Sequence, residues 1–272
     1  NRVIGERKMS ENQIPKVFHY CWFGGNELTE SVKKCIQSWK KYCPDYQIIR
    51  WDESNYDYTK NKYMREAYQQ KKWGFVSDYA RLDILYNYGG IYLDTDVEII
   101  RSFDDLLEYK AFMGFENNYV ALGLGFGARK HVEEIKEMRD EYENLSFILP
   151  DGSLNMRPVP RYTTEYLEAR GLVANGTRQT INGIEIFPTE YFCPKDFYTK
   201  ECKKTKNTYS IHHYDSSWWG EEEKSRYEKE AELKAKNLWL WRIQNGVRVL
   251  KEDGIRVLIK KIVEMLKSRK YC

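Results

Sequence analysis

The chain has 272 residues, 42% of them hydrophobic and 31% charged, which is ordinary for a soluble globular protein of one large domain or one domain with an appendage. The net charge of +3 is too small to indicate nucleic-acid binding by itself, and no apolar run approaches the ~18 residues that a membrane span needs. Aromatic residues are abundant, with 22 Tyr and 8 Trp, which suits surfaces that stack on rings or sugars.

Hydrophobic patterning predicts a β-α-β order for the start of the chain. A strand that ends at the Gly-Gly pair 24–25 precedes a helix within residues 29–44, and a second strand follows at 46–51. Thr29 or Ser31 can cap this helix. Because β-α-β units build parallel sheets, we expect an α/β fold.

The clearest helix pattern covers residues 75–88 and stops at the Gly-Gly pair 89–90, and a strand at 91–94 follows at once. A shorter helix is expected before it, at roughly 61–72. The remaining predicted elements are a strand at 111–116, a helix at 131–145, a loop at 150–161 and strands at 183–188 and 208–214.

Two aspartates, Asp94 and Asp96, end the strand at 91–94 and are separated by one threonine. Residues two apart on an extended backbone face the same way, so both carboxylates can converge on one cation. Mg²⁺ or Mn²⁺ fits, because carboxylate oxygens suit these ions and leave coordination positions for substrate phosphates. Two surface aspartates in a turn are the alternative that the spacing leaves open. We expect Glu98, the next acid, to be structural and outside the site.

The helix before these acids adds two charged candidates, Asp78 and Arg81, which stand three residues apart on one face. A plain salt bridge would explain them equally well. In α/β proteins, however, ligands bind beyond the carboxyl ends of strands, which is where Asp94 and Asp96 are expected. The position of this helix directly before the acids therefore favours a role at the same site.

A late segment, SIHHYDSSWW at residues 210–219, places His212 and His213 at the end of a predicted strand. Neighbouring strand residues face opposite ways, so at most one of the two histidines is expected at a given site. That histidine can complete a cation site or serve the structure alone.

Two glycine-containing segments have less specific patterns. In HYCWFGG, Trp22 can pack in the core or offer a platform for a planar base. The GLGFGA segment lacks the spacing of nucleotide-binding glycine loops. We expect Gly123, Gly125 and Gly127 to permit close approach of the backbone.

Together these blocks resemble the glycosyltransferase family 32 enzymes, which are sugar transferases with a DXD motif. The matching blocks are IPKVFHYCWFGG, FVSDYARLDILYNYGGIYLDTDVE and SIHHYDSSW, in this order between residues 14 and 218. The bacterial capsular polysaccharide members look most similar, and the glucosylating clostridial toxins are similar more remotely. The resemblance implies a GT-A fold, in which a Rossmann-like, mixed and mostly parallel sheet is flanked by helices.

The resemblance also implies roles for individual residues. Asp78 and Arg81 would hold the donor sugar and its surroundings. Asp94 would touch ribose and sugar and meet the metal indirectly, and Asp96 would bind Mn²⁺ or Mg²⁺ with the diphosphate; these four form the predicted catalytic set. The other donor-site and metal candidates are Trp22 to stack on the base, Asn55 to contact the ribose, Ser216 and Trp218 beside the phosphates, and His213, preferred over His212, as a metal ligand.

The implied activity is metal-dependent, retaining transfer of a hexose from a UDP- or GDP-sugar to a saccharide acceptor, in capsule or surface polysaccharide synthesis. Since no residue is a convincing covalent nucleophile, we expect front-face substitution. The alternatives are a protein-glucosylating effector, a non-catalytic module that binds nucleotide-sugars or carbohydrates, and a metal-stabilised scaffold.

We expect three regions: a disordered lead-in at 1–13, a GT-A catalytic domain at 14–220 and a basic helical extension at 221–272. From Leu233 onward 11 basic residues stand against 3 acidic ones. The extension at 233–272 therefore either packs on the catalytic domain or meets anionic lipid, where a polyprenyl-linked acceptor would lie. Six cysteines without a CxxC pair and a polar start unlike a signal peptide predict a cytoplasmic protein, peripheral on the inner face of the membrane in the second case.

Overall fold

The computed structural model describes residues 12–215 and scattered helical positions between 225 and 259. The chain divides into two compact units, Asn1–Lys195 with Cys202–Trp218 and Asp196–Glu201 with Trp219–Cys272. The expected lead-in and basic extension lie mostly outside the described residues, and the predicted domain boundaries stay predictions. None of the described helices is long and apolar enough to cross a membrane.

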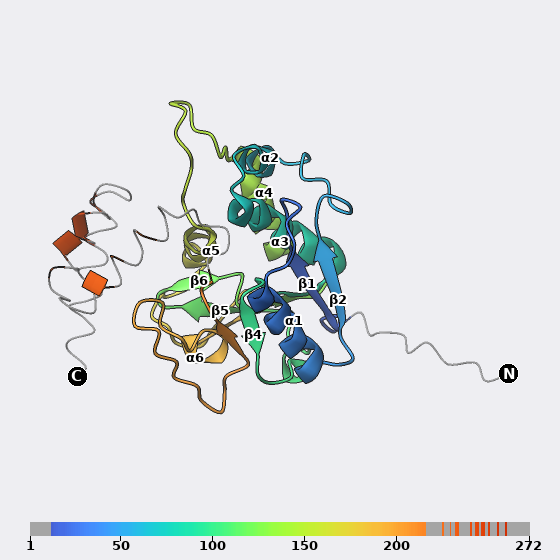
Figure 1. Cartoon of the computed structure of the whole chain (residues 1–272). Helices are drawn as coiled ribbons and strands as arrows, with labels where there is room; N and C mark the ends of the chain where they lie inside the picture. The colour runs from blue at the N-terminus through green and yellow to red at the C-terminus, as the bar shows by residue number, and fades with distance from the viewer. Residues whose placement is uncertain are drawn as a thin grey trace. The chain divides into compact units, whose positions relative to one another are not determined.

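Within residues 12–215, one eight-stranded sheet has the order β2-β1-β3-β7-β5-β9-β8, with β6 beside β5 (Figure 1). Five strands run in one direction: β1 Val17–Cys21, β2 Gln47–Trp51, β3 Gly90–Tyr92, β5 Ala111–Glu116 and β9 Ile184–Phe187. Three run the opposite way: β6 Tyr119–Ala121, β7 Phe126–Ala128 and β8 Gln179–Ile181. The α/β class and the mixed, mostly parallel sheet that the GT-A resemblance implies are confirmed.

A second, two-stranded sheet joins distant parts of the chain. β4, Val97–Ile99, pairs antiparallel with β10, Ser210–His212, and His212 lies opposite Val97. This pairing brings the late histidine segment to the residues that directly follow Asp96.

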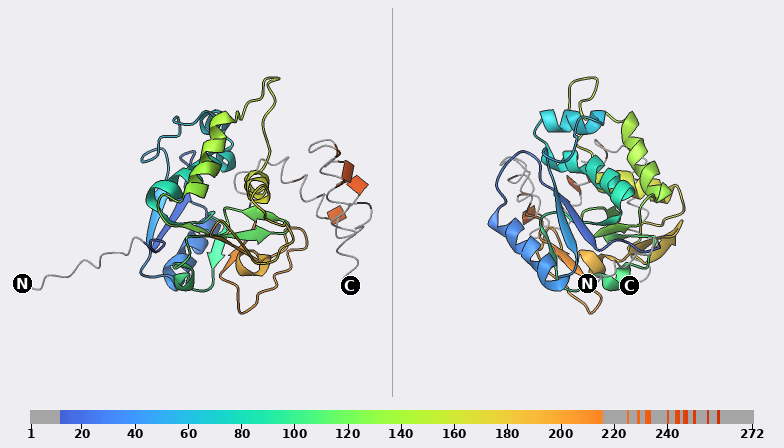
Figure 2. Two further views of the ribbon diagram at one scale, coloured as in Figure 1. Left: turned by 180° about the vertical axis from the view of Figure 1, so that it is seen from behind. Right: turned by 90° about the vertical axis from the view of Figure 1, so that its right-hand side faces the viewer.

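Helices cover both faces of the large sheet, with α1 on one side and α3 and α4 on the other (Figure 2). Neighbouring strand residues point to opposite faces, so Phe112 joins one hydrophobic cluster and Met113 joins the other. The helices are α1 Glu30–Tyr42, α2 Lys62–Gln69, α3 Trp73–Tyr88, α4 Glu133–Asp140, α5 Val159–Glu168 and the short α6 Thr189–Phe192, with 3₁₀ turns η1 Asp104–Leu106 and η2 Glu141–Asn144.

Most of the predicted elements are present, and the differences have local causes. Thr29, rather than Ser31, caps α1, since its side chain accepts a hydrogen bond from the Val32 N–H at 3.3 Å. The helix predicted at 131–145 is α4 followed by the 3₁₀ turn η2. The three-residue strands β4, β6, β7 and β8 were not predicted. The two helices that were not predicted, α5 and α6, both begin at prolines.

His19, in β1, is fully buried and hydrogen-bonded at both ring nitrogens. Its Nε2 lies 2.9 Å from the carbonyl oxygen of Gly89, and its Nδ1 accepts a hydrogen bond of 3.1 Å from Trp51 Nε1. Because Nδ1 accepts, Nε2 carries the proton and the ring is neutral. Burial lowers the pKa of His19 to about 4.

We therefore expect acid to destabilise the fold through His19. On acidification the unfolded chain binds the proton near pH 6.5, well before the folded chain does. The contribution of neutral His19 to the free energy of unfolding is complete above that pH and is lost as the pH falls toward 4. It amounts to about 3 kcal/mol in all. Urea unfolding at several pH values measures this. The free energy of unfolding should fall less steeply with decreasing pH in His19→Gln than in the wild type, because glutamine cannot take up this proton. Equal slopes for the variant and the wild type would contradict the assignment.

Candidate active site

The turn from α3 into β3 places the two aspartates. Gly89 ends α3 with φ of 63°, and Gly90 begins β3 with φ of 103°, both in the region that favours glycine. A Cβ on Gly90 would also lie 2.7 Å from the carbonyl oxygen of Val17. The chain therefore passes from helix to strand without a loop, and Asp94 and Asp96 follow directly beyond the strand.

Arg81, on α3, links the helix to Asp94. Its Nη2 lies 3.1 Å from Asp78 Oδ1 and 3.5 Å from Asp94 Oδ1, and its guanidinium lies 4.9 Å from the centre of the Tyr92 ring. Arg81 also donates hydrogen bonds to the carbonyl and hydroxyl oxygens of Ser77. Its charge is buried but fully paired, and it holds the Asp94 carboxylate toward the helix.

Asp78 differs from an ordinary carboxyl group. It is 5% exposed, and burial raises its pKa to about 7, although Arg81 opposes this shift. Near neutral pH this side chain can therefore either donate or accept a hydrogen bond.

Asp96 is held on three sides by residues of the late segment. Its Oδ1 lies 3.2 Å from His212 Nε2, and its Oδ2 accepts a hydrogen bond of 3.0 Å from the backbone N–H of Asp215. Its own carbonyl oxygen accepts a hydrogen bond of 2.9 Å from the backbone N–H of His213. Burial would raise the pKa of Asp96, but His212 and the backbone N–H groups outweigh it and hold that pKa below its usual value.

The two histidines face different acids. His212, not His213, has its ring at Asp96, whereas Nε2 of His213 lies 2.8 Å from Glu98 Oε2. This differs from the placement expected for His213, and the cause is the register of β10, which presents His212 beside the aspartate pair. The metal role expected of His213 is untested by this geometry, and the substitutions proposed below separate it from a role of His212.

Gly123 packs against Asp94. The Asp94 N–H donates a hydrogen bond of 2.8 Å to the Gly123 carbonyl oxygen, and a Cβ on Gly123 would lie only 1.7 Å from Asp94 Oδ2. In the same segment a Cβ on Gly127 would meet the Phe112 ring at 2.2 Å. Both glycines therefore permit the close approach that we expected of the GLGFGA segment.

The other donor-site candidates follow strands of the same sheet or lie outside the described residues. Trp22 follows β1, is half-buried and donates from Nε1 to the carbonyl oxygen of Asn26 at 2.8 Å. Asn55, after β2, is exposed; it donates to the carbonyl oxygen of Arg50 in β2 and accepts from the Asp52 N–H. Ser216 and Trp218 lie outside the described residues.

The side chains around Asp96 fit a divalent cation. Two neighbouring ligands of an octahedral ion, each at ~2.1 Å, are about 3 Å apart, and Asp96 Oδ1 and His212 Nε2 are separated by 3.2 Å. A carboxylate and an imidazole suit Mn²⁺, and Asp94 adds negative charge nearby.

Sequence reasoning missed two residues beside His212. Donor atoms of Glu116, Cys193 and His212 all lie within 4.8 Å of one another. Glu116 is the last residue of β5, so a carboxylate at the end of a parallel strand was a usable signal. Cys193 follows α6 and had no such signal.

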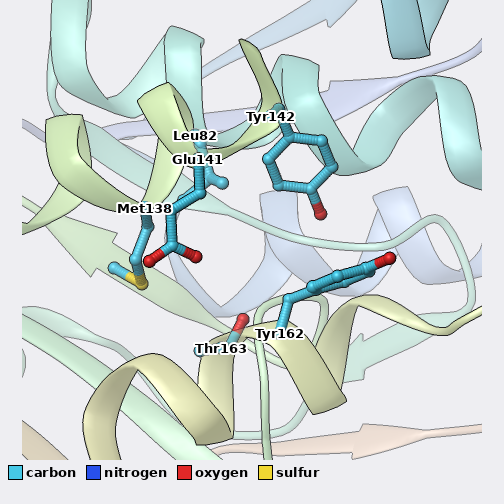
Figure 3. A pocket seen from close by; sticks show the side chains of 6 residues that line it. All are labelled: Leu82, Met138, Glu141, Tyr142, Tyr162 and Thr163. Carbon is cyan, nitrogen blue, oxygen red and sulfur yellow. The ribbon is translucent and has the colours of Figure 1, made fainter. Parts of the chain in front are cut away.

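A separate small pocket lies between the helices, and none of the predicted site residues that the structure describes lines it. Figure 3 shows Met138 and Glu141 facing Tyr162 and Thr163 of α5 across this space. Its remaining lining residues are Leu82 and Tyr142. The acids and the histidine of the candidate site lie elsewhere.

Residues 29–113 match the family model described as a glycosyltransferase sugar-binding region containing a DXD motif. The matched stretch includes Asp78, Arg81, Asp94 and Asp96. This stretch is thus similar to the sugar-binding region of the DXD glycosyltransferases. This confirms the family resemblance seen in the sequence.

Known proteins similar to this chain include fungal enzymes. It is 34% identical over 122 residues to inositol phosphoceramide mannosyltransferase 3 of Schizosaccharomyces pombe, covering 41% of this chain and 34% of that protein. It is 33% identical over 104 residues to mannosyl phosphorylinositol ceramide synthase SUR1 of Saccharomyces cerevisiae, covering 37% and 27%. The chain thus spans about a third of the length of these curated relatives. The solved PaToxG glycosyltransferase is similar with a TM-score of 0.45 at 19% identity, covering 58% of this chain and 69% of that one.

The packing of Gly123 on Asp94 predicts that, in the transfer reaction proposed below, Gly123→Ala lowers turnover by about 100-fold, because the methyl group displaces the carboxylate and small misplacements are costly. Gly152→Ala is the matched control, since nothing lies within 4 Å of its Cβ. Its φ of 81° makes a loss of stability expected there, without a loss of turnover. Wild-type turnover in Gly123→Ala would show that this contact is dispensable.

Proposed function

We propose that the chain is a metal-dependent, retaining glycosyltransferase that moves a hexose from a nucleotide-diphosphate sugar to a saccharide acceptor. The supporting observation is that two acids two residues apart beyond the end of β3 each meet a basic side chain from another part of the chain: Asp94 meets Arg81, and Asp96 meets His212. The family match over residues 29–113 supports the same reaction class.

In this proposal Asp96 and His212 hold Mn²⁺ or Mg²⁺. The bound ion would neutralise charge on the departing nucleoside diphosphate. The pairing of Asp96 with the Asp215 N–H keeps one carboxylate oxygen fixed while the other faces His212. These contacts set the position of the ligands before the substrate arrives, which lowers the cost of reorganisation.

Arg81 and Asp78 would act on the sugar side. Arg81 orients Asp94, which can then accept hydrogen bonds from donor hydroxyls. Asp78, with its pKa near 7, can donate to or accept from a sugar hydroxyl. Trp22, Asn55, Ser216 and Trp218 keep their proposed donor contacts.

We propose front-face substitution for the chemical step. The acceptor hydroxyl attacks the anomeric carbon on the side from which the diphosphate departs, and the leaving phosphate oxygen takes up the hydroxyl proton. The new glycosidic bond forms as the bond to the diphosphate breaks, so the configuration is retained. A trapped glycosyl-enzyme adduct, detected by mass spectrometry, would overturn this step.

The finer assignments extend this proposal. The curated relatives are named for mannose transfer to inositol phosphoceramide, so we propose mannose as the first hexose to test, with GDP-mannose beside UDP-galactose and UDP-glucose. A role in capsule or surface polysaccharide synthesis is proposed from the bacterial resemblance, whereas the polyprenyl-linked acceptor and the cytoplasmic site near the membrane are proposed from the basic residues of 233–272, the cysteine pattern and the polar start. Sedimentation with anionic liposomes at low salt tests the membrane contact.

Removal of the Asp96 charge is the main test of function. Asp96→Asn should lower turnover by about 10²–10³-fold and weaken Mn²⁺ binding, because a ligand and its charge are lost. Glu98→Gln is a matched control two residues away, since that acid pairs with His213, and it should keep wild-type turnover. The measurements are nucleotide release from a donor panel with and without Mn²⁺ and calorimetric titration with Mn²⁺. A non-catalytic binding module would show no turnover in the wild type.

The two histidines can be separated by substitution. We expect His212→Ala to weaken Mn²⁺ binding by at least ~10-fold, because it removes a ligand adjacent to Asp96, whereas His213→Ala should bind Mn²⁺ like the wild type. Both variants lose the same group from consecutive positions, so each controls for the other. The reverse result would assign the metal to His213.

A further inference from the structure

The imidazole of His212 has the side chains of three other polar residues around it. Its Nε2 is at Asp96, and one polar atom each of Glu116, at the end of β5, and Cys193, after α6, lies within 4.8 Å of a ring nitrogen. Glu116 and Cys193 both lie outside the stretch that matches the family model. Three separate elements thus bring their polar atoms to one imidazole.

The Nδ1 atom of His212 is buried and makes no hydrogen bond of normal geometry with the part of the chain that the structure describes. A neutral imidazole carries one N–H, and a nitrogen that meets a cation must present its lone pair. If Nε2 faces the cation, Nδ1 carries the proton and needs an acceptor. The Glu116 carboxylate and the Cys193 sulfur are nearby groups that can accept it, since one atom of each lies within 4.8 Å of a ring nitrogen of His212 and of the other.

Tyr214 connects these two acceptors and covers the ring. Its hydroxyl lies 2.9 Å from Cys193 Sγ and also bonds to Glu116. Its ring centre lies 4.2 Å from that of His212. Cys193 is 2% exposed, whereas Glu116, His212 and Tyr214 are partly buried. An interconnected group of this kind can fix both the tautomer and the angle of the imidazole.

We propose that Glu116 is a positioning residue which, together with Cys193, accepts the Nδ1 proton of His212 and holds its Nε2 toward Asp96. This inference rests on the proposed cation site and names the residues that orient its histidine ligand. Glu116 touches neither the cation nor the sugar in this role; it acts through His212.

The test measures Mn²⁺ affinity directly, by calorimetric titration of the full chain without nucleotide-sugar. Glu116→Gln, which keeps the shape and removes the carboxylate, should weaken Mn²⁺ binding by about 10–100-fold. Glu116→Asp should recover part of this loss, because it restores an acceptor on a shorter side chain. Tyr214→Phe should weaken binding by about 10-fold, since it releases both acceptors, and it decides the question if Glu116→Gln does not fold.

Glu185→Gln is the matched control. Glu185 is also a largely buried carboxylate of the same sheet, on the neighbouring strand β9, but it bonds to Arg178 and Thr180. This variant should bind Mn²⁺ like the wild type. Thermal midpoints in EDTA report the structural cost of each change separately from the metal affinity.

The outcomes separate this inference from the proposed function. If Asp96→Asn loses Mn²⁺ but the folded Glu116 and Tyr214 variants bind it like the wild type, the positioning role is overturned and the cation site stands. If the wild type binds no Mn²⁺, both fall. A Zn²⁺ ion that binds in addition to Mn²⁺ and is lost in Cys193→Ser would also overturn the positioning role, because Glu116, Cys193 and His212 would then be ligands of a second ion.

Discussion

The site depends on the antiparallel pairing of β4 with β10. This pairing brings a segment more than a hundred residues away in the sequence against Asp96, whose two carboxylate oxygens and carbonyl oxygen each meet a residue of that segment. Without β10, Asp96 would be one acid in an exposed turn. With it, the carboxylate has a fixed direction and an imidazole beside it. Short strands of this kind gain their stability from the surrounding core, in which Val97 and Ile99 are completely buried.

The second constraint on the site is the buried positive charge of Arg81, which α3 carries. Arg81 is 4% exposed, and it is acceptable there only because Asp78, Asp94 and the oxygens of Ser77 surround its guanidinium. The same contacts fix Asp94 from the helix side, while Gly123 leaves room for its carboxylate from the other. The acids are thus held in place by the fold before any ligand binds, as electrostatic preorganisation requires.

The part of the chain that matches the DXD glycosyltransferases contributes only one side of this arrangement. It supplies α3, β3 and the acids, whereas Glu116, Cys193 and His212 come from later in the chain. β3 and β5 run in the same direction, so the acids that follow β3 and Glu116 at the end of β5 lie at the same edge of the sheet, because the carboxyl ends of parallel strands share an edge. The metal and donor sides of the proposed site are therefore assembled from two stretches of sequence around one sheet edge.

The sequence alone determined the β-α-β start, α3 with its Gly-Gly stop, and the position of Asp94 and Asp96 just beyond the strand that follows the helix of Asp78 and Arg81. These depend on local periodicity and on turns, which are written in neighbouring residues. Tertiary structure alone decided which histidine meets Asp96 and that Glu116 and Cys193 stand behind it. The reason is register: His212 and His213 are equivalent by local pattern, and only the pairing of β10 with β4 selects the one that faces the acid.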